Sequence, residues 1–155
     1  MSQNWDVYLS GEIHTDWRDR IAAGIEAAGL PVSLSAPVTD HSASDDCGVE
    51  ILGQESSDFW KDNKGARINA IRTRTLIERA DVVVVRFGDK YRQWNAAFDA
   101  GYAAAAGIPV ITLHDPALNH ALKEVDAASL AVAETPEQVV EVLRYVIEGK
   151  LSRET

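Results

Sequence analysis

The chain has a single cysteine, Cys47, so no internal disulfide can form. It has no paired Cys-x-x-Cys or His-x-x-x-His units, and we therefore expect no metal site. No apolar run approaches the roughly 18 residues that a membrane-spanning helix needs. The first six residues also lack the cationic start of a secretory signal. These absences predict a cytoplasmic protein that does not enter or bind a membrane.

Basic residues are scarce as well. Lys and Arg number 15 against 24 Asp and Glu, which gives a formal net charge of −9. A protein that binds nucleic acid or an anionic membrane needs a basic surface to neutralise phosphates. We therefore expect a small molecule as the partner and no nucleic acid. The 155 residues, 46% of them hydrophobic, predict one domain over 1–155 with its own core.

Three common ligand-binding motifs are missing. No Gly-x-Gly-x-x-Gly follows the first predicted strand, and the chain has no Gly-x-x-x-x-Gly-Lys-Ser/Thr and no Gly-x-Ser-x-Gly. These absences argue against a dinucleotide-binding domain, a P-loop NTPase and an α/β-hydrolase. We expect no cofactor.

Short apolar runs bounded by polar residues and glycine predict five β-strands. The strongest is the run of four valines at 82–85, which indicates a strand buried on both faces in the middle of a parallel sheet. The other predicted strands cover residues 7–10, 31–35, 108–113 and 129–133.

Helical spacing separates these strands, with predicted helices at 17–28, 63–80, 95–106, 117–125 and 136–148. Alternation of strands and helices is typical of an α/β fold with right-handed crossovers. We therefore predict a doubly wound, five-stranded parallel sheet in a flavodoxin-like or Rossmann-like three-layer sandwich. The first and third strands should be neighbours at its centre.

Residues 36–62 lack clear periodicity and carry seven acidic residues and one lysine. A loop of this length in a small domain is more often functional than a plain connector. We expect it to fold over the binding crevice as a mobile or partner-ordered lid, with Phe59 and Trp60 as its anchors.

In doubly wound folds, ligands bind beyond the carboxyl ends of the strands, where the strand order reverses. Here that point lies between the first and third strands. It directs attention to the loop after the first strand, the loop after Val85 and the start of the helix at Asn95. The carboxylates and aromatic residues there are Tyr8, Glu12, Asp89, Tyr91, Trp94, Asp99 and Tyr102.

Several of these segments resemble a known family. They are the strand at 7–11 (Val-Tyr-Leu-Ser-Gly), Ala80-Asp81 before the valine strand, 98–102 (Phe-Asp-Ala-Gly-Tyr) and 108–110 (Ile-Pro-Val). Together they resemble the nucleoside 2-deoxyribosyltransferase-like superfamily, and most of all its YtoQ-type branch, over residues 6–113. In that family a glutamate displaces the base and forms a covalent sugar intermediate. The matching residue here is Asp99, one methylene shorter. The resemblance also implies a homodimer or higher homo-oligomer whose sites are completed across subunits.

The leading hypothesis is a nucleoside- or nucleotide-handling enzyme that cleaves or transfers an N-glycosidic bond. Asp99 would be the nucleophile, and Glu12 or Asp89 the second acid that such chemistry usually needs. A carboxylate near the first turn of a helix is kept ionised by the amides there, which suits a nucleophile. The residues expected to contact the substrate are Tyr8, Ser10, Gly11, Trp94, Asn95 and Tyr102.

The same residues also permit a different function, a non-catalytic module that senses a nucleotide or sugar metabolite in the same crevice. Asp99 and Glu12 can each serve as a structural acid at the start of a helix. Tyr8 and Tyr102 can pack in the core instead of against a base. The two hypotheses differ in Asp99, because a binding module does not need a carboxylate aimed at the anomeric carbon.

Overall fold

A parallel five-stranded sheet forms the centre of the computed structural model, which describes residues 3–152. Its strand order is β2-β1-β3-β4-β5, which confirms that the first and third strands are neighbours at the centre. The strands are β1 (Trp5–Gly11), β2 (Val32–Ser35), β3 (Val82–Arg86), β4 (Val110–Leu113) and β5 (Ala131–Ala133). The predicted α/β sandwich is therefore the observed fold.

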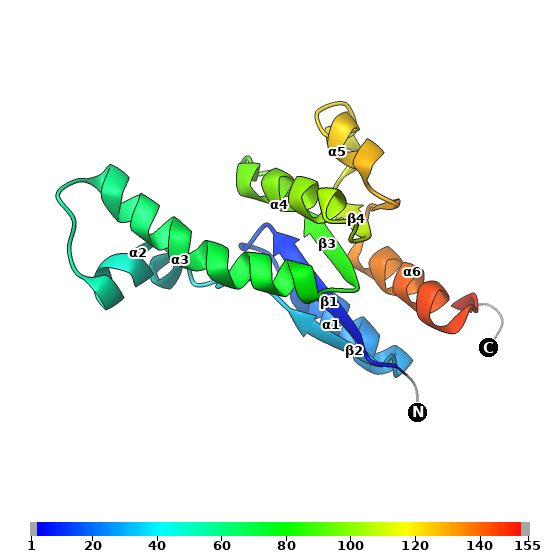
Figure 1. Cartoon of the computed structure of the whole chain (residues 1–155). Helices are drawn as coiled ribbons and strands as arrows, with labels where there is room; N and C mark the ends of the chain where they lie inside the picture. Colours follow the sequence, from blue (N-terminus) through cyan, green and yellow to red (C-terminus); the bar gives the residue numbers. More distant parts are fainter. Residues whose placement is uncertain (1–2, 153–155) are drawn as a thin grey trace.

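Helices cover both faces of the sheet (Figure 1). The helices are α1 (Trp17–Ala28), α2 (His41–Leu52), α3 (Asp58–Arg79), α4 (Trp94–Ala105), α5 (Lys123–Ala128) and α6 (Pro136–Glu148). The valines of β3 show how the two layers form. Val82 and Val84 pack with α1 and α6, whereas Val83 and Val85 pack with α3 and α4. A strand buried on both faces needs apolar residues at every position, which explains the unbroken valine run.

Three predicted segments differ from the structure in the second half of the chain. The helix expected at 117–125 is a 3-10 turn at Pro116–Leu118 followed by α5, and β4 and β5 are shorter than the predicted 108–113 and 129–133. Asp115 caps the turn by accepting a hydrogen bond of 2.8 Å from the Ala117 amide. Within residues 3–152, no helix is both long and apolar enough to cross a membrane.

The expectation of an irregular lid at 36–62 is wrong, because α2 and the start of α3 form a helical hairpin there. The Asp40 and Ser57 side chains cap the two helices. Gly48 of α2 lies against Gly65 of α3, and a Cβ on Gly48 would come within 2.7 Å of the Gly65 nitrogen. Only Gly48 and Val49 of α2 are buried, so the helix has no apolar stripe to reveal it in the sequence.

The expected anchors of the lid are also wrong. Phe59 and Trp60 contact each other edge to face and remain 67% and 53% exposed. They lie at the tip of the hairpin together with the exposed Ile51 and Leu52. Figure 1 shows this hairpin tip projecting away from the sheet.

Candidate functional site

A cavity of about 1130 Å³ opens at the carboxyl ends of β1 and β3, which is the predicted switch point. Its walls come from the loop after β1, the α2–α3 hairpin, the body of α3, the loop after β3 and the start of α4. The sequence-predicted residues that line it are Gly11, Glu12, Tyr91, Trp94, Asn95, Asp99 and Tyr102, whereas Tyr8 and Ser10 are not part of the lining.

Asp99 lies in this cavity and is tied to the end of β1. The Ser10 hydroxyl, which is fully buried, donates a hydrogen bond of 2.7 Å to Oδ2 of Asp99. Burial raises the pKa of Asp99, and the hydrogen bond from Ser10 opposes that rise. The sheet therefore fixes one carboxylate oxygen and leaves Oδ1 for another contact.

The sequence predicted that amides in the first turn of α4 would keep Asp99 ionised, and the structure does not show this arrangement. Asp99 is the sixth residue of α4, so it lies beyond the first turn and its amides. Its hydrogen bond comes from Ser10 instead, and its pKa is raised and not lowered. The helix dipole weakens within the first turn, which is the physical reason for the difference.

Tyr8 lies in the core between the sheet and the layer of α3 and α4, one inward position before Ser10. Its ring is fully buried, and its hydroxyl has no hydrogen-bond partner within bonding geometry among the described residues. Burial raises the pKa of Tyr8 to about 12, while the Thr73 hydroxyl acts in the opposite direction and the Asp99 charge adds to the rise. The phenol of Tyr8 is therefore neutral in the folded protein near neutral pH.

Gly11 allows β1 and β3 to approach each other at the mouth of the cavity. Its φ is +110°, and a Cβ there would lie 2.1 Å from the carbonyl oxygen of Arg86. The next amide, of Glu12, donates a hydrogen bond of 3.1 Å to the same oxygen. Only glycine fits this position.

Glu12 is 5% exposed, and its carboxylate holds its own loop together. It accepts hydrogen bonds from the His14 amide and from the amide and hydroxyl of Thr15, and it lies 3.6 Å from the Arg86 guanidinium. Burial tends to raise the pKa of Glu12, but these hydrogen bonds and the charge of Arg86 outweigh it and lower the pKa. The Glu12 carboxylate is therefore harder to protonate than an ordinary glutamate, which suits a structural role.

Arg18, which the sequence did not single out, anchors the same loop from the other side. Its guanidinium donates hydrogen bonds to the carbonyls of Leu9, Gly11 and Glu12 and stacks over the ring of Trp17. Burial lowers the pKa of Arg18 to about 10. The end of β1 is therefore held rigidly at the cavity.

Asp89, the second candidate for an acid or base, lies outside the cavity. It is exposed in the loop after β3, whereas Tyr91 and Arg92 of the same loop line the cavity. The Gln93 side chain fixes the loop by accepting a hydrogen bond of 3.0 Å from the Gly88 amide. The structure thus brings Glu12 and Asp99 to one cavity but leaves Asp89 in solvent.

The aromatic residues of α4 differ in their surroundings. Trp94 is 74% exposed at the first turn, beside Asn95, so its ring is open to a flat ligand. Tyr102 is half-buried, with its hydroxyl bonded to Glu78 and the Arg74 guanidinium 6.0 Å from its ring. Trp94 therefore has the freer ring for stacking on a base.

Sequence reasoning placed residues 36–62 over the crevice as a loop, but it did not predict the helical wall that this segment forms there with α3. The wall consists of the hairpin and α3 residues His41, Ser44, Asp45, Asp62, Gly65, Ala66, Asn69, Ala70, Arg72, Thr73, Arg74 and Ile77. Part of this wall belongs to the segment expected to be a loop. Among the described residues, no group of three His, Cys, Asp or Glu side chains could hold a metal ion.

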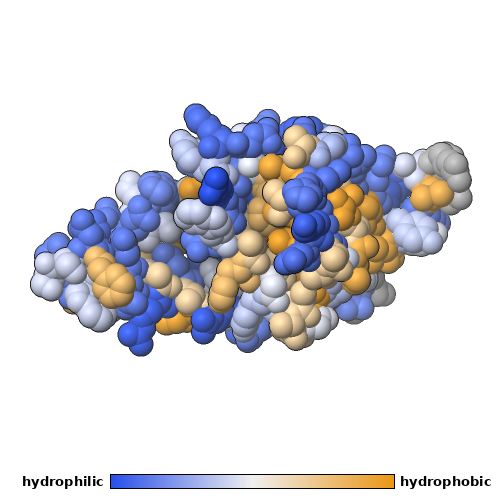
Figure 2. Space-filling view, turned by 90° about the horizontal axis from the view of Figure 1, so that it is seen from above, coloured by the Kyte–Doolittle hydropathy of each residue, from blue (hydrophilic) through white to orange (hydrophobic). Residues whose placement is uncertain are grey.

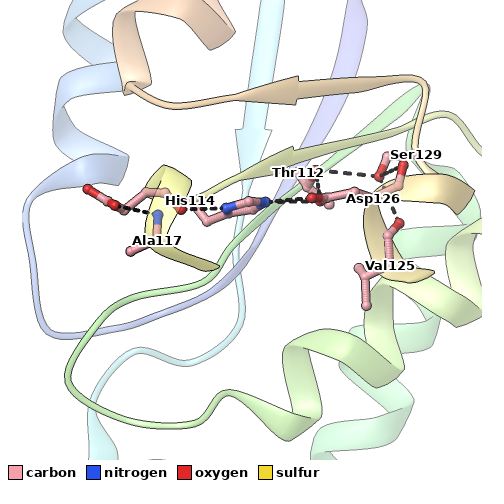
Figure 3. Close-up of polar contacts among 7 residues, drawn as sticks. Thr112, His114, Ala117, Val125, Asp126 and Ser129 are labelled. Atoms are coloured by element: carbon pink, nitrogen blue, oxygen red, sulfur yellow. Dashed lines mark hydrogen bonds and ion pairs between the residues drawn. The ribbon is translucent and has the colours of Figure 1, made fainter. Parts of the chain in front are cut away.

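A second polar cluster lies at the end of β4 (Figure 3), and none of its residues lines the cavity that holds Asp99. The fully buried ring of His114 lies between the Asp115 carbonyl, 2.8 Å from Nδ1, and the Asp126 carboxylate, 2.9 Å from Nε2. Asp126 also accepts a hydrogen bond of 2.8 Å from Thr112. Both nitrogens of the ring are occupied, so this histidine joins α5 to the sheet and is not available to a ligand.

The chain matches a known protein family over most of its length. The family model described as "Nucleoside 2-deoxyribosyltransferase YtoQ" matches residues 8–147. The chain is 41% identical to the protein YtoQ of Bacillus subtilis (strain 168) over 142 residues, which cover 92% of this chain and 96% of that relative.

Solved structures share the fold at low sequence identity. A conserved protein from Enterococcus faecalis V583 aligns with a TM-score of 0.63 at 13% identity, covering 93% of this chain and 99% of that one. A 2-deoxyribosyltransferase from Bacillus psychrosaccharolyticus aligns with a TM-score of 0.53 at 15% identity, covering 87% and 90% of the two chains.

Proposed function

Because the chain belongs to the nucleoside 2-deoxyribosyltransferase YtoQ family, we propose that it cleaves or transfers the N-glycosidic bond of a nucleoside or nucleotide, with Asp99 as the nucleophile. The observation that carries the proposal is the hydrogen bond from Ser10 to Asp99 inside the cavity at the switch point. It holds one carboxylate oxygen, so that the other can point toward an anomeric carbon. The orientation of the Asp99 carboxylate thus supports the reaction that family membership suggests.

The chemistry follows from the surroundings of Asp99. Its ionised carboxylate attacks the anomeric carbon while the base departs with the electrons of the C–N bond, through an oxocarbenium-like transition state. A buried carboxylate is poorly solvated and therefore more basic, as its raised pKa indicates. Water or a second base then attacks the same carbon and releases Asp99.

The residues around Asp99 suit a flat base and a polar sugar. The exposed ring of Trp94 offers a stacking surface, and the neighbouring Asn95 offers amide hydrogen bonds. Tyr102 supplies a second aromatic edge on the same wall. We assign these three residues to substrate binding.

We also propose that the working unit is a homodimer or higher homo-oligomer. Large apolar side chains are exposed at the hairpin tip, and on α4 Phe98 is 60% exposed. Figure 2 shows hydrophobic residues gathered over the part of the molecule where α4 lies. Exposed apolar surface of this kind is typical of a protein–protein contact. A second copy of the chain would bury it next to the cavity.

The test is release of free base from adenosine, 2′-deoxyadenosine, their cytosine counterparts and the corresponding 5′-monophosphates, measured by chromatography. Wild-type protein should release base from at least one of them, and Asp99→Asn should lower that rate at least about a hundredfold. Glu26→Gln, an exposed carboxylate on α1 outside the cavity, is the matched control and should keep the wild-type rate. Tight binding without base release would support the metabolite-binding module instead.

A further inference from the structure

The proposed reaction needs a proton donor, and none of the three carboxylates expected from the sequence, Asp99, Glu12 and Asp89, is placed to supply one. A base that leaves a sugar takes a negative charge on nitrogen unless an acid protonates it. Asp99 is the nucleophile, and the lowered pKa of Glu12 makes it a poor acid near neutral pH. Asp89 lies in solvent outside the cavity. Other side chains that line the cavity are therefore the candidates for the acid.

His14 lies on the loop that Glu12 folds. The His14 amide donates to Oε1 of Glu12, and the Thr15 amide donates to the same oxygen over 2.8 Å. The backbone on both sides of the imidazole is thus fixed, while the side chain itself is exposed to the cavity that holds Asp99. Glu12 therefore positions the backbone of His14 beside the cavity.

The ring of Tyr91 fixes the imidazole from the opposite loop. The two ring centroids are 5.0 Å apart, with the planes tilted by 50°. Tyr91 follows β3 and His14 follows β1, so their contact joins the two loops that flank the switch point. Such a contact limits the rotation of the imidazole and keeps it at the cavity.

The other three histidines do not compete for this role. His41 lines the cavity but pairs with Asp45 on its own helix over 3.1 Å. The ring of His114 is buried between two acceptors, as Figure 3 shows. His120 is not part of the lining.

The charged groups around His14 come from both loops. Glu12 bonds the His14 amide, and Arg86 lies 3.6 Å from the Glu12 carboxylate. On the other side, Lys90 lies 5.9 Å from the Tyr91 ring, and Arg92 lines the cavity. Histidine is the side chain that ordinarily exchanges a proton between pH 5 and 8. It can therefore give up a proton and take it back within one catalytic cycle.

We propose that His14 is the general acid that protonates the leaving base, oriented by Tyr91 and presented by the loop folded on Glu12. This inference rests on the proposed function. In the first step an Asp99 oxygen bonds to the anomeric carbon, the C–N bond breaks, and the base nitrogen takes its electron pair and the proton of the His14 imidazolium. In the second step water attacks the anomeric carbon, Asp99 leaves, and the proton of the water returns to His14.

The test compares leaving groups that need a proton with one that does not. The substrates are adenosine and 2′-deoxyadenosine with their 5′-monophosphates, and 4-nitrophenyl β-D-ribofuranoside, whose nitrophenolate departs without protonation. His14→Gln should lower base release at least about a hundredfold, yet change nitrophenolate release by less than about threefold. A fall of the wild-type base-release rate with rising pH should be absent in this variant. Because the side chain is exposed, the variant should keep the wild-type melting temperature.

Tyr91 supplies a second, independent pair of variants. Tyr91→Phe keeps the ring beside His14 and should retain most of the activity on adenine substrates, whereas Tyr91→Ala should lower it and spare nitrophenolate release. An equal loss on both classes of leaving group in His14→Gln would overturn the proposal and leave Asp99 as nucleophile intact. Wild-type protein that releases nitrophenolate but no base would do the same. No release from any substrate would remove the proposed function itself.

Discussion

Ser10 and Asp99, 89 residues apart in the sequence, are joined by a hydrogen bond of 2.7 Å across the switch point of the sheet. Ser10 lies opposite Val85 in the register between β1 and β3, and Asp99 reaches it from the second turn of α4. The hydroxyl stabilises the charged form of a carboxyl whose pKa is raised by burial. The position and the ionisation of Asp99 therefore depend on the end of β1.

Replacing Ser10 by alanine should shift the pH dependence of base release. Without the hydroxyl the pKa of Asp99 rises further, so the acidic limb of the kcat/KM profile should move to higher pH. The rate should approach the wild-type value at the alkaline end of that limb. Ser33→Ala, at an exposed position on β2, is the control and should leave the profile unchanged. An unshifted acidic limb in Ser10→Ala would argue against Asp99 as the group that must ionise.

Asp99 should cost the protein stability at neutral pH. Its pKa is raised in the folded state above the ordinary value of 3.8, so the folded state holds its proton more tightly than the unfolded state. The resulting loss of stability is absent below pH 3.8 and develops as pH rises through the folded-state pKa. Asp99→Asn should therefore melt at a higher temperature than wild type at pH 7, and the difference should close toward pH 3.8. Calorimetry that finds the variant less stable at pH 7 would contradict this.

Gly11 should tolerate no side chain. In Gly11→Ala the new Cβ would meet the Arg86 carbonyl at 2.1 Å on a backbone with φ of +110°, and we expect a loss of at least about 2 kcal/mol in the free energy of unfolding. Gly29→Ala, at the end of α1, has φ of +62° and nothing within 4 Å, and should cost only about 1 kcal/mol. Urea unfolding of both variants measures the difference. Equal costs would mean that β1 and β3 can separate at the mouth of the cavity.

The oligomeric state can be measured directly by light scattering. The exposed Phe59 and Trp60 at the hairpin tip, and Phe98 on α4, predict a homo-oligomer at micromolar concentration. A double change of Phe59 and Trp60 to serine should shift the protein toward the monomer without lowering the melting temperature of the monomer. A wild-type monomer that binds and turns over substrate fully would rule the assembly out.

The sequence predicted the sheet because its signals are local. The valine run of β3 is apolar at every position because the strand is buried on both faces, and Gly11 marks the residue at which β1 ends. The α2–α3 hairpin escaped prediction because its packing depends on the close approach of Gly48 and Gly65 and leaves Ile51, Leu52 and Phe59 exposed. No amphipathic pattern remains when the helices pack through glycine.

Part of the candidate site could be predicted, because the segment around Asp99 can be identified from the sequence alone. Asp99 could be identified from its segment and brought to the cavity by the strand order. The structural role of Glu12 could not be predicted from the sequence. It depends on hydrogen bonds from the amides of His14 and Thr15 and on the charge of Arg86, which lies on another strand. The hydrogen bond from Ser10 likewise appears only when β1 and α4 are placed together.

The most direct test of the account is trapping of the sugar on Asp99. Wild-type protein incubated with a nucleoside that it cleaves, quenched in acid and digested, should yield a peptide that contains Asp99 with the mass of one added glycosyl group. Asp99→Asn should yield none and should release base at least about a hundredfold more slowly, equal to a barrier increase of about 2.7 kcal/mol. Unchanged turnover in Asp99→Asn, or a glycosyl group found on a different residue, would contradict the account.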